Sequence, residues 1–446
     1  MEDVEDGGAL AAADHRRSVK ALARKTDILE TRRAMSSSQL DVPANLQPTR
    51  AAREAWRWGF PLALGLAVIL RLGFSYVSRG NYDLESWEVA AKLVDEGKNV
   101  YANTVRYNSG PWWSLIVWVL WRVSHLLPIH NSFHVSIVGF LTLVDVSIAL
   151  FIRRRFSSLA AAIFLLCPVT IVLTAVHSQF DELAVLLGLL AWDQLTRGSR
   201  PSCWVRAGLL MGLSLSCKHL MLFFPIWAVM DRSLGSWRNR LGFAAIAYAT
   251  FAACFIPWAI DPQGRAGIVQ NVFLYRSLSA NGITPMLVSL IFPDGALAGL
   301  VNEQWAGWFL QRKLPTLVWL GCLMIIGWIT SKRRPADLIY LYLLAFVGLS
   351  PAMADQYLAI PVVACAIAYR WWPSWAYFAV AFIHLCYSGA NLGPPLTAIF
   401  PGIFGYEVTL YWQAQVCLVA LVAALLYWPD RAIHSDGQVE TQLVGR

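Results

Sequence analysis

Long apolar runs, separated by short polar turns, recur along most of the chain. A helix needs about 20 apolar residues to span a bilayer, and fewer where short helices pack inside a bundle. The pattern therefore predicts an all-α polytopic membrane bundle with about 12 transmembrane helices. The predicted membrane segments are 58–77, 135–152, 157–175, 182–196, 204–218, 219–231, 241–260, 314–331, 336–350, 357–370, 374–389 and 408–428.

The polar stretch after the first segment contains two further helical patterns. Residues 112–127 are apolar enough to span, but their tryptophans beside Arg122 and His125 are typical of a membrane interface. Before them, an apolar face and a charged face alternate at helical spacing. The apolar positions are Leu84, Trp87, Ala91 and Val94, and the charged positions are Glu85, Glu88, Lys92 and Asp95. We expect both stretches to form interfacial amphipathic helices on the outer surface.

Basic residues between the apolar segments set the predicted orientation. They gather in the turns at 153–155, 197–200, 232–240, 332–334, 370 and 431. If 112–127 does not span, all of these turns are cytoplasmic, as the positive-inside rule requires. We therefore expect a disordered cytoplasmic tail at 1–54, a transmembrane domain at 55–430 with outer loops 78–134 and 261–313, and a cytoplasmic tail at 431–446. The first tail has no apolar stretch long enough to predict a secretory signal.

The composition agrees with a membrane protein and excludes several classes. Of 446 residues, 57% are hydrophobic and 14% are charged, which is unusual for a soluble domain. The net charge of +8 comes from the basic turns, so we expect no nucleic-acid partner. The eight cysteines stand singly without CxxC spacing, which favours neither a disulfide framework nor a zinc site. The chain has no GxGxxG, Walker or GxSxG motif.

The stretch 177–182, His-Ser-Gln-Phe-Asp-Glu, is a group of polar residues between two apolar runs. An ionisable side chain near a bilayer costs several kcal/mol unless it is paired or faces a wet cavity. A functional site and a solvated turn are the two interpretations. Other polar residues fall on the same predicted outer face: Asp83, Glu85, Lys218, His219, Arg276, Asp355 and Gln356.

Some of these residues suit acid–base or anion chemistry. Asp83 lies at the membrane rim, where a partly desolvated carboxylate can act as a base; a helix N-cap is the alternative. Lys218 interrupts an apolar run and would be costly without an anion, unless it snorkels to the interface. Arg71 and Arg106 are candidates to bind phosphate, but either could equally pair with a structural carboxylate or a lipid headgroup.

Several short motifs, in order along residues 58–370, resemble the GT-C superfamily of multi-pass glycosyltransferases that use polyprenyl-phosphate sugars. They are Asp83-Leu84-Glu85 after the first segment, the aromatic and proline motif from Tyr107 to Trp113, Cys167-Pro168 followed by His177 to Asp181, the stretch from Ala207 to Pro225 that contains Lys218-His219, and Asp355-Gln356-Tyr357-Leu358 before Pro361. In related glucosyltransferases an asparagine commonly stands where this chain has Asp181.

The resemblance implies an inverting transfer of a hexose, mannose or glucose, from a polyprenyl phosphate to an acceptor hydroxyl on the outer or lumenal face. Asp83 matches the position of the base, and Glu85 is the reserve candidate. The implied residues for donor phosphate or sugar are Lys218, His219, Arg276, His177, Gln179, Asp181, Arg71 and Arg106.

The implied partners are a polyprenyl-phosphate sugar, a lipid-linked, glycan or protein acceptor, and membrane lipids. We expect no cofactor beyond the lipid-linked donor. His130 and His134 stand four residues apart, but without a third ligand nearby we expect no divalent metal. The expected location is a bacterial cell membrane, or the endoplasmic reticulum membrane in a eukaryote, with both termini cytoplasmic.

Two other functions remain open. In a transporter or flippase for a lipid-linked or small anionic substrate, the outer carboxylates would relay protons or bind cations. Transporters usually place such sites near the midplane, whereas these polar residues gather at one rim. A non-catalytic subunit of a glycan-assembly complex would keep the fold but not need the base, and the presence of Asp83 argues weakly against it.

Overall fold

The computed structural model describes residues 50–78, 80–197, 201–274, 283–284, 302, 304, 314–331, 338–351, 353–387 and 406–427. The chain divides into the units Met1–Ala52 and Arg53–Arg446, and nearly all described residues belong to the second. Most of the predicted tail 1–54, all of the tail 431–446 and most of the loop 261–313 lie outside the described residues.

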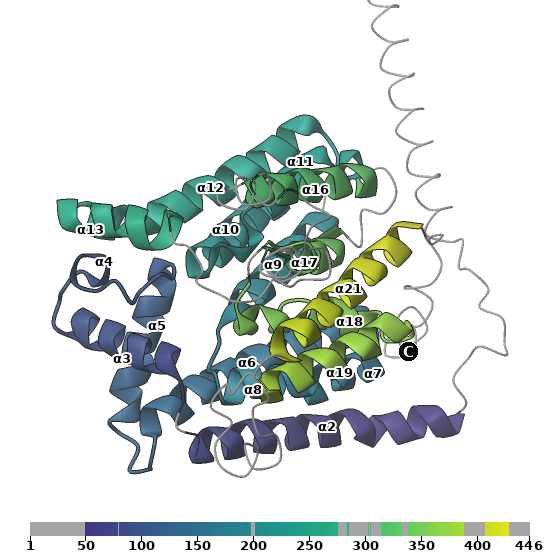
Figure 1. Ribbon diagram of the computed structural model, residues 1–446, viewed down its shortest axis with the longest axis horizontal. Helices are drawn as coiled ribbons and strands as arrows, with labels where there is room; N and C mark the ends of the chain where they lie inside the picture. The colour runs from purple at the N-terminus through teal and green to yellow at the C-terminus, as the bar shows by residue number, and fades with distance from the viewer. Residues whose placement is uncertain are drawn as a thin grey trace, which may run out of the picture. The chain divides into compact units, whose positions relative to one another are not determined.

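The described residues form helices and turns without an extended strand (Figure 1). Four of these helices contain stretches long and apolar enough to cross a membrane. They are α2 (Arg50–Val77), α6 (Ser132–Arg155), α12 (Trp237–Ala259) and α21 (Tyr406–Tyr427). Each coincides with a predicted segment, so the prediction of an all-α helical membrane protein is confirmed.

The predicted segment 157–175 is a bent pair rather than one straight helix. Helices α7 (Ser158–Leu166) and α8 (Pro168–Ala175) meet at an angle of 49°. Pro168 has no backbone N–H and disfavours a helical conformation at the preceding Cys167, which has φ −60° and ψ 120°. The polar stretch 177–182 follows directly after the end of α8.

The remaining predicted segments correspond to shorter helices. These are α9 (Asp181–Arg197), α10 (Pro201–Cys217), α11 (Phe224–Met230), α16 (Leu314–Thr330), α17 (Leu338–Gly348), α18 (Val362–Ile367) and α19 (Trp372–Tyr387). Short 3₁₀ turns at His219–Met221, Arg232–Leu234 and Asp355–Ala359 complete this part. Each is shorter than 18 residues, so the number of about 12 transmembrane helices stays a prediction.

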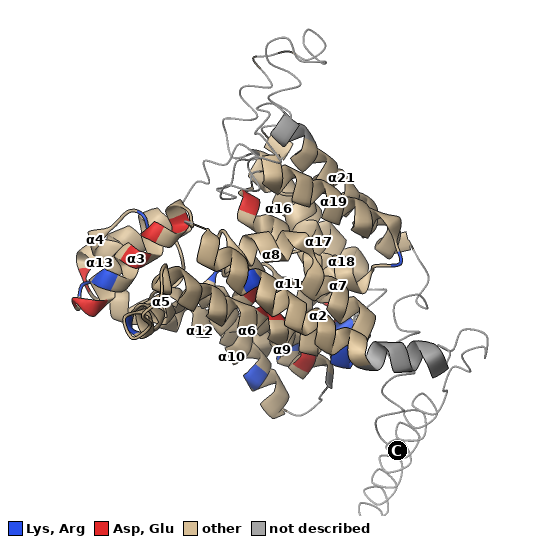
Figure 2. Ribbon diagram, turned by 90° about the horizontal axis from the view of Figure 1, so that it is seen from below, with Lys and Arg blue, Asp and Glu red and all other residues tan. Residues whose placement is uncertain are grey.

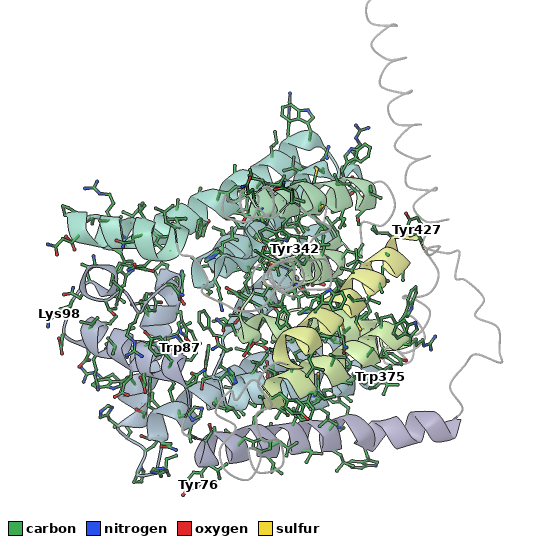
Figure 3. The ribbon with its side chains drawn as sticks, in the orientation of Figure 1. Tyr76, Trp87, Lys98, Tyr342, Trp375 and Tyr427 are labelled. Carbon is green, nitrogen blue, oxygen red and sulfur yellow. The ribbon has the colours of Figure 1, made fainter. Side chains whose placement is uncertain are left out.

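Close backbone contacts hold α10 between its neighbours. A Cβ atom on Gly212 would lie 2.4 Å from Cβ of Thr250, so α10 and α12 can approach this closely only with glycine there. On the α9 side, the Ser214 hydroxyl donates to the carbonyl of Ala184 at 2.6 Å. Tyr342 of α17 lies among the bundle helices (Figure 3) and donates to the carbonyl of Leu220 at 2.7 Å. The last of these contacts holds the turn that follows Lys218.

The predicted outer loop 78–134 forms helices α3 (Tyr82–Asp95), α4 (Val100–Asn103) and α5 (Pro111–Ser124), with α4 packed against α13 (Pro262–Ile268). Charged residues gather around α3 and α13, whereas α16, α17 and α18 carry few (Figure 2). Trp87 and Ala91 of α3 are buried and Glu85 is exposed, so the predicted amphipathic helix is confirmed.

Helix α5 also has two faces. Trp113 and Val117 are buried against the protein, whereas Trp112, Val119 and Val123 are exposed. The helix has 14 residues, or about 21 Å at 1.5 Å per residue, which is short of a bilayer core of about 30 Å. The exposed apolar face is what an interfacial helix needs, and its location on the outer surface stays a prediction.

Candidate functional site

The polar stretch 177–182 is a buried turn between α8 and α9. Ser178 adopts a left-handed conformation with φ 53°, and the backbone N–H of Gln179 donates to the carbonyl of Leu173 at 3.0 Å. The side chains of His177, Gln179 and Asp181 are all more than nine-tenths buried. The interpretation as a solvated turn is therefore wrong, because these polar groups are removed from water and held by the fold.

Asp83 is connected directly to this turn. The side-chain amide of Gln179 donates to Oδ2 of Asp83 at 2.6 Å. Helix α3 is capped by Asn81 instead, whose Oδ1 accepts from the backbone N–H groups of Asp83 and Leu84 at 3.1 Å. The N-cap alternative for Asp83 is therefore wrong. Its half-buried carboxylate is held in place by an amide that comes from 96 residues further along the chain.

Lys218 contributes a buried positive charge to the same site. Its ammonium lies 2.7 Å from the carboxylate of Asp181, and it sits 5.1 Å from the ring centroid of Phe180 and 5.0 Å from that of Tyr357. Both distances fall within the range of cation–π attraction. Asp83 interacts electrostatically with Asp181 and with Lys218. Two carboxylates and one ammonium thus share this site.

The outer-loop helices help to position Lys218 and its neighbours. The N–H of Gly110, which precedes α5, donates to the carbonyl of Cys217 at 3.0 Å. A Cβ atom on Gly110 would lie 1.9 Å from the carbonyl oxygen of Ser216, so only glycine fits this contact. Trp113 stacks on Phe180 with ring centroids 4.1 Å apart.

Tyr107 fixes the turn that carries Gly110. Its hydroxyl donates to the carbonyl of Gly110 at 2.6 Å. Burial raises the pKa of Tyr107, so the hydroxyl stays protonated and remains a donor. The aromatic and proline motif is therefore a structural connection between the outer loop and the end of α10.

Arg71 occupies a separate, fully buried position. Its guanidinium donates to Asp145 of α6 at 2.9 Å, to the carbonyl of Leu165 at 2.9 Å, to the Thr170 hydroxyl at 3.1 Å and to the carbonyl of Ala67 at 3.3 Å. Of the alternatives that the sequence left open, pairing with a structural carboxylate is the one observed. With four protein acceptors, the Arg71 guanidinium is part of the helix packing and not of the site around Asp83.

The structure places two of the three remaining candidates for donor binding, Arg106 and His219. Arg106 pairs with Glu85 at 3.1 Å and stacks on the ring of Tyr82 at 4.0 Å, with the Glu85 side chain 71% exposed. His219 is half-buried at the start of the 3₁₀ turn after Lys218. Arg276 lies outside the described residues.

The two histidines considered for a metal do not share a helix face. His130 is exposed and precedes α6, while His134 is buried within its first turn, and Asn131 between them has φ 54°. Among the residues that the structure describes, no three His, Cys, Asp or Glu side chains come together as metal ligands.

Several residues of this region were not singled out from the sequence. Asp145 is a lone charge within a predicted membrane segment, a pattern that itself indicates a partner. Tyr357 and Phe180 were noted only as parts of motifs, although both rings face Lys218. His384 was not named at all, and its Nε2 lies 2.9 Å from Oδ1 of Asp355, a contact between residues 29 positions apart that no local pattern indicates.

Comparison with known proteins gives little further information. No family model matches the sequence, and no curated protein matches it. Among solved structures, the chain is similar to ArnT from Cupriavidus metallidurans bound to undecaprenyl phosphate, with 13% identity over 82% of this chain and 76% of that one and a TM-score of 0.46. It is also similar to the apo state of the same protein, with 15% identity over 84% and 77% and a TM-score of 0.46.

Proposed function

We propose that this chain is a membrane glycosyltransferase of the GT-C kind, which transfers a sugar from a polyprenyl-phosphate donor to an acceptor hydroxyl. The observation that carries the proposal is the hydrogen bond from Gln179 to Asp83 beside the Lys218–Asp181 ion pair. A carboxylate held in a fixed position and a buried ammonium are the two groups that such a transfer needs.

Asp83 is the general base in this mechanism. The acceptor hydroxyl oxygen attacks the anomeric carbon of the donor sugar, and its proton passes to the Asp83 carboxylate. The bond between the anomeric carbon and the phosphate oxygen breaks on the opposite side, so the configuration inverts. The Gln179 amide fixes the carboxylate, which reduces the reorganisation needed for proton transfer.

Lys218 stabilises the leaving group. The electron pair of the broken bond goes to the polyprenyl phosphate, whose negative charge grows in the transition state, and a positioned ammonium favours that charge selectively. His219 is adjacent to Lys218 and is the second candidate contact for the phosphate. Since Lys218 supplies positive charge, the proposed reaction requires no divalent metal.

The identity of the sugar is part of the proposal. We propose a hexose, mannose or glucose, with His177, Gln179 and Asp181 near the donor, an acceptor on a lipid, glycan or protein, and transfer at the outer or lumenal face. We also propose that the chain is a multi-pass protein of a bacterial cell membrane, or of the endoplasmic reticulum membrane in a eukaryote.

The test is a transfer assay with the purified full chain in nanodiscs and a panel of polyprenyl-phosphate sugars, run with and without EDTA. We expect transfer with at least one hexose donor, its persistence in EDTA, and its loss in Asp83→Asn. Glu96→Gln is the matched control, because Glu96 is an exposed carboxylate at the C-terminal end of α3. Equal transfer by wild type and Asp83→Asn would remove Asp83 as the base.

A flippase or transporter is the competing function and predicts a different result. Such a protein would move a lipid-linked substrate between leaflets without cleaving the bond to phosphate. Absence of product with every donor, together with movement of a fluorescent polyprenyl-phosphate analogue across vesicles that contain the protein, would replace the transferase proposal.

A further inference from the structure

Glu182 is a buried acidic residue that the function proposed above does not use. It lies in the first turn of α9 with 3% of its surface exposed. Its carboxyl group contacts its own backbone N–H, but neither carboxyl oxygen has a hydrogen-bond partner on another residue in the described part of the chain. Buried polar groups in proteins are nearly always hydrogen-bonded, so this one needs a physical explanation.

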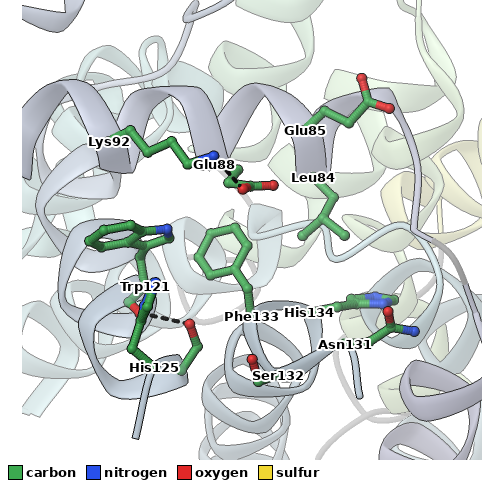
Figure 4. A pocket seen from close by; sticks show the side chains of 11 residues that line it. Leu84, Glu85, Glu88, Lys92, Trp121, His125, Asn131, Ser132, Phe133 and His134 are labelled. Carbon is green, nitrogen blue, oxygen red and sulfur yellow. Dashed lines mark hydrogen bonds and ion pairs between the residues drawn. The ribbon is translucent and has the colours of Figure 1, made fainter. Parts of the chain in front are cut away.

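The glutamates on the exposed face of α3 are in a different situation. Glu88 pairs with Lys92 at 2.7 Å (Figure 4), and Glu85 pairs with Arg106 at 3.1 Å. Both side chains also reach water, since Glu88 is 44% and Glu85 is 71% exposed. A carboxylate in such a place is ionised at little cost. Glu182 is buried, and no described cation forms an ion pair with it.

The charged groups around Glu182 come from three helices. Among the described residues they are Arg71 of α2, Asp145 of α6 and Asp181 of α9 itself, each of which interacts electrostatically with Glu182. Arg71 is already paired with Asp145 at 2.9 Å. Asp181 is paired with Lys218 at 2.7 Å. The two cations therefore balance the two aspartates and leave no positive charge for Glu182.

An ionised Glu182 would be a third buried anion beside two that are already neutralised. Moving a carboxylate out of water without a paired cation carries a large penalty, and a buried group avoids it by holding its proton. The N-terminus of a helix attracts negative charge, but by much less than this penalty. Asp145 and Asp181 would also repel the added charge. Burial and charge balance both favour the neutral acid.

The charge of Glu182 affects the proposed transfer site through Asp181. Asp181 interacts electrostatically with Glu182. It also interacts with Lys218 and Asp83. A negative charge on Glu182 would therefore weaken the positive potential that a donor phosphate meets at Lys218, and would oppose the charge that grows on the leaving group.

We propose that Glu182 is a positioning residue that acts as a neutral carboxylic acid, and that its proton keeps Lys218 available to the donor phosphate. The link to the phosphate rests on the function proposed above. The consequence is a pH dependence with a definite sign. As the pH rises and Glu182 loses its proton, the added negative charge weakens the binding of a phosphate at Lys218.

The first test is infrared spectroscopy of the purified full chain at neutral pH, in an ester-free detergent so that no lipid C=O band interferes. A protonated carboxylic acid has a C=O stretching band that an ionised carboxylate lacks. The difference spectrum between wild type and a neutral variant, Glu182→Gln or Glu182→Met, should contain one such band. Glu88→Gln is the matched control, because Glu88 is exposed and paired with Lys92, and its difference spectrum should contain none. Absence of the band in both Glu182 spectra would overturn the proposal.

The second test is the binding of undecaprenyl phosphate, a polyprenyl phosphate without a sugar, over the pH range in which the wild-type band disappears. We expect the Kd of wild type to rise about tenfold relative to that of Glu182→Gln, as for one added charge in a partly buried site. Ionisation of the lipid phosphate affects both proteins equally. At neutral pH the two should bind alike, because Gln is neutral and close in shape to the protonated acid. An equal pH dependence in both, a band that persists at every pH, or binding lost by Glu182→Gln at neutral pH would each contradict the role of Glu182.

Neither measurement requires sugar transfer, so the two proposals can fail separately. Absence of transfer with every donor, with the infrared band and the difference in Kd both present, would reject the transferase and retain Glu182 as a neutral acid beside an anion site. Transfer that depends on Asp83, without an infrared band from Glu182, would reject only the role of Glu182.

Discussion

Arg71 and Lys218 are two buried cations that differ in how completely the protein surrounds them. Arg71 donates to one carboxylate, one hydroxyl and two carbonyls, which belong to α2, α6, α7 and α8. Among the described residues, the ammonium of Lys218 forms an ion pair with one carboxylate, Asp181, interacts electrostatically with Asp83, and lies about 5 Å from two aromatic rings. Arg71 thus joins four helices, whereas Lys218 keeps the capacity to meet another anion.

The chemistry of the two side chains explains the difference. A guanidinium offers five donors in a rigid plane and suits several fixed acceptors, while an ammonium is a compact charge with three rotatable donors. Aromatic rings stabilise the charge of an ammonium by cation–π attraction, which leaves its N–H groups free to form hydrogen bonds with another anion. Lys218 is also the cation that interacts with Asp83. We infer that Arg71 serves the fold and that Lys218 serves the reaction.

The largest expected effect is on stability, at Arg71. Arg71→Met leaves the carboxylate of Asp145 buried without its cation, and we expect a loss of about 3–5 kcal/mol of unfolding free energy. Removal of both charges in Arg71→Met/Asp145→Leu should recover much of this loss, because an apolar pair replaces the ion pair. Denaturant unfolding of the variants in detergent measures both values. An Arg71→Met variant as stable as wild type would contradict the inference that Arg71 stabilises the fold.

At Lys218 the expected effect is on activity. Lys218→Met combined with Asp181→Asn removes the cation without leaving a buried unpaired carboxylate. We expect transfer to fall about 10²–10³-fold, as for the loss of one transition-state donor, with a smaller loss of stability than in Arg71→Met. The transfer assay and the same unfolding measurement check both parts. Full activity in the double variant would contradict a role for Lys218 at the leaving group.

Gln179 is expected to show a smaller effect, on kcat. Gln179→Leu removes the hydrogen bond that fixes Asp83. A hydrogen bond to a charged group contributes about 1.5–3 kcal/mol, so we expect kcat to fall about 10–100-fold. KM should change little, because Gln179 is a positioning residue in this proposal. Gln263→Leu, at an exposed position of α13, is the matched control. A rise in KM with kcat unchanged would make Gln179 a substrate-binding residue instead.

The sequence predicts part of this arrangement and misses part of it for physical reasons. Asp83, Gln179 and Lys218 were assigned to one face, because the positive-inside rule orders the turns and polar residues at a rim require partners. The pairing of Gln179 with Asp83 was not predictable, since it depends on the left-handed backbone at Ser178. The Arg71–Asp145 pair could have been predicted from the sequence, because each residue is a lone charge in an apolar segment and such charges rarely stay unpaired.

The smallest expected effects are those of substitutions at Glu85 and Arg106. Unlike the ion pairs of Arg71 and Lys218, the ion pair between these two residues is not fully buried. Their ion pair is exposed on the Glu85 side, and such pairs contribute about 0.2–1 kcal/mol. Arg106→Ala also removes the stacking on Tyr82 and the hydrogen bonds to the Ser86 hydroxyl and the Tyr82 carbonyl, so we expect the unfolding free energy to fall by about 1–2 kcal/mol, less than in Arg71→Met. Glu85→Gln should retain much more transfer than Asp83→Asn, because no described side chain other than Arg106 holds its carboxylate in place. If Glu85→Gln loses transfer as completely as Asp83→Asn, the base assignment must move along α3 to Glu85.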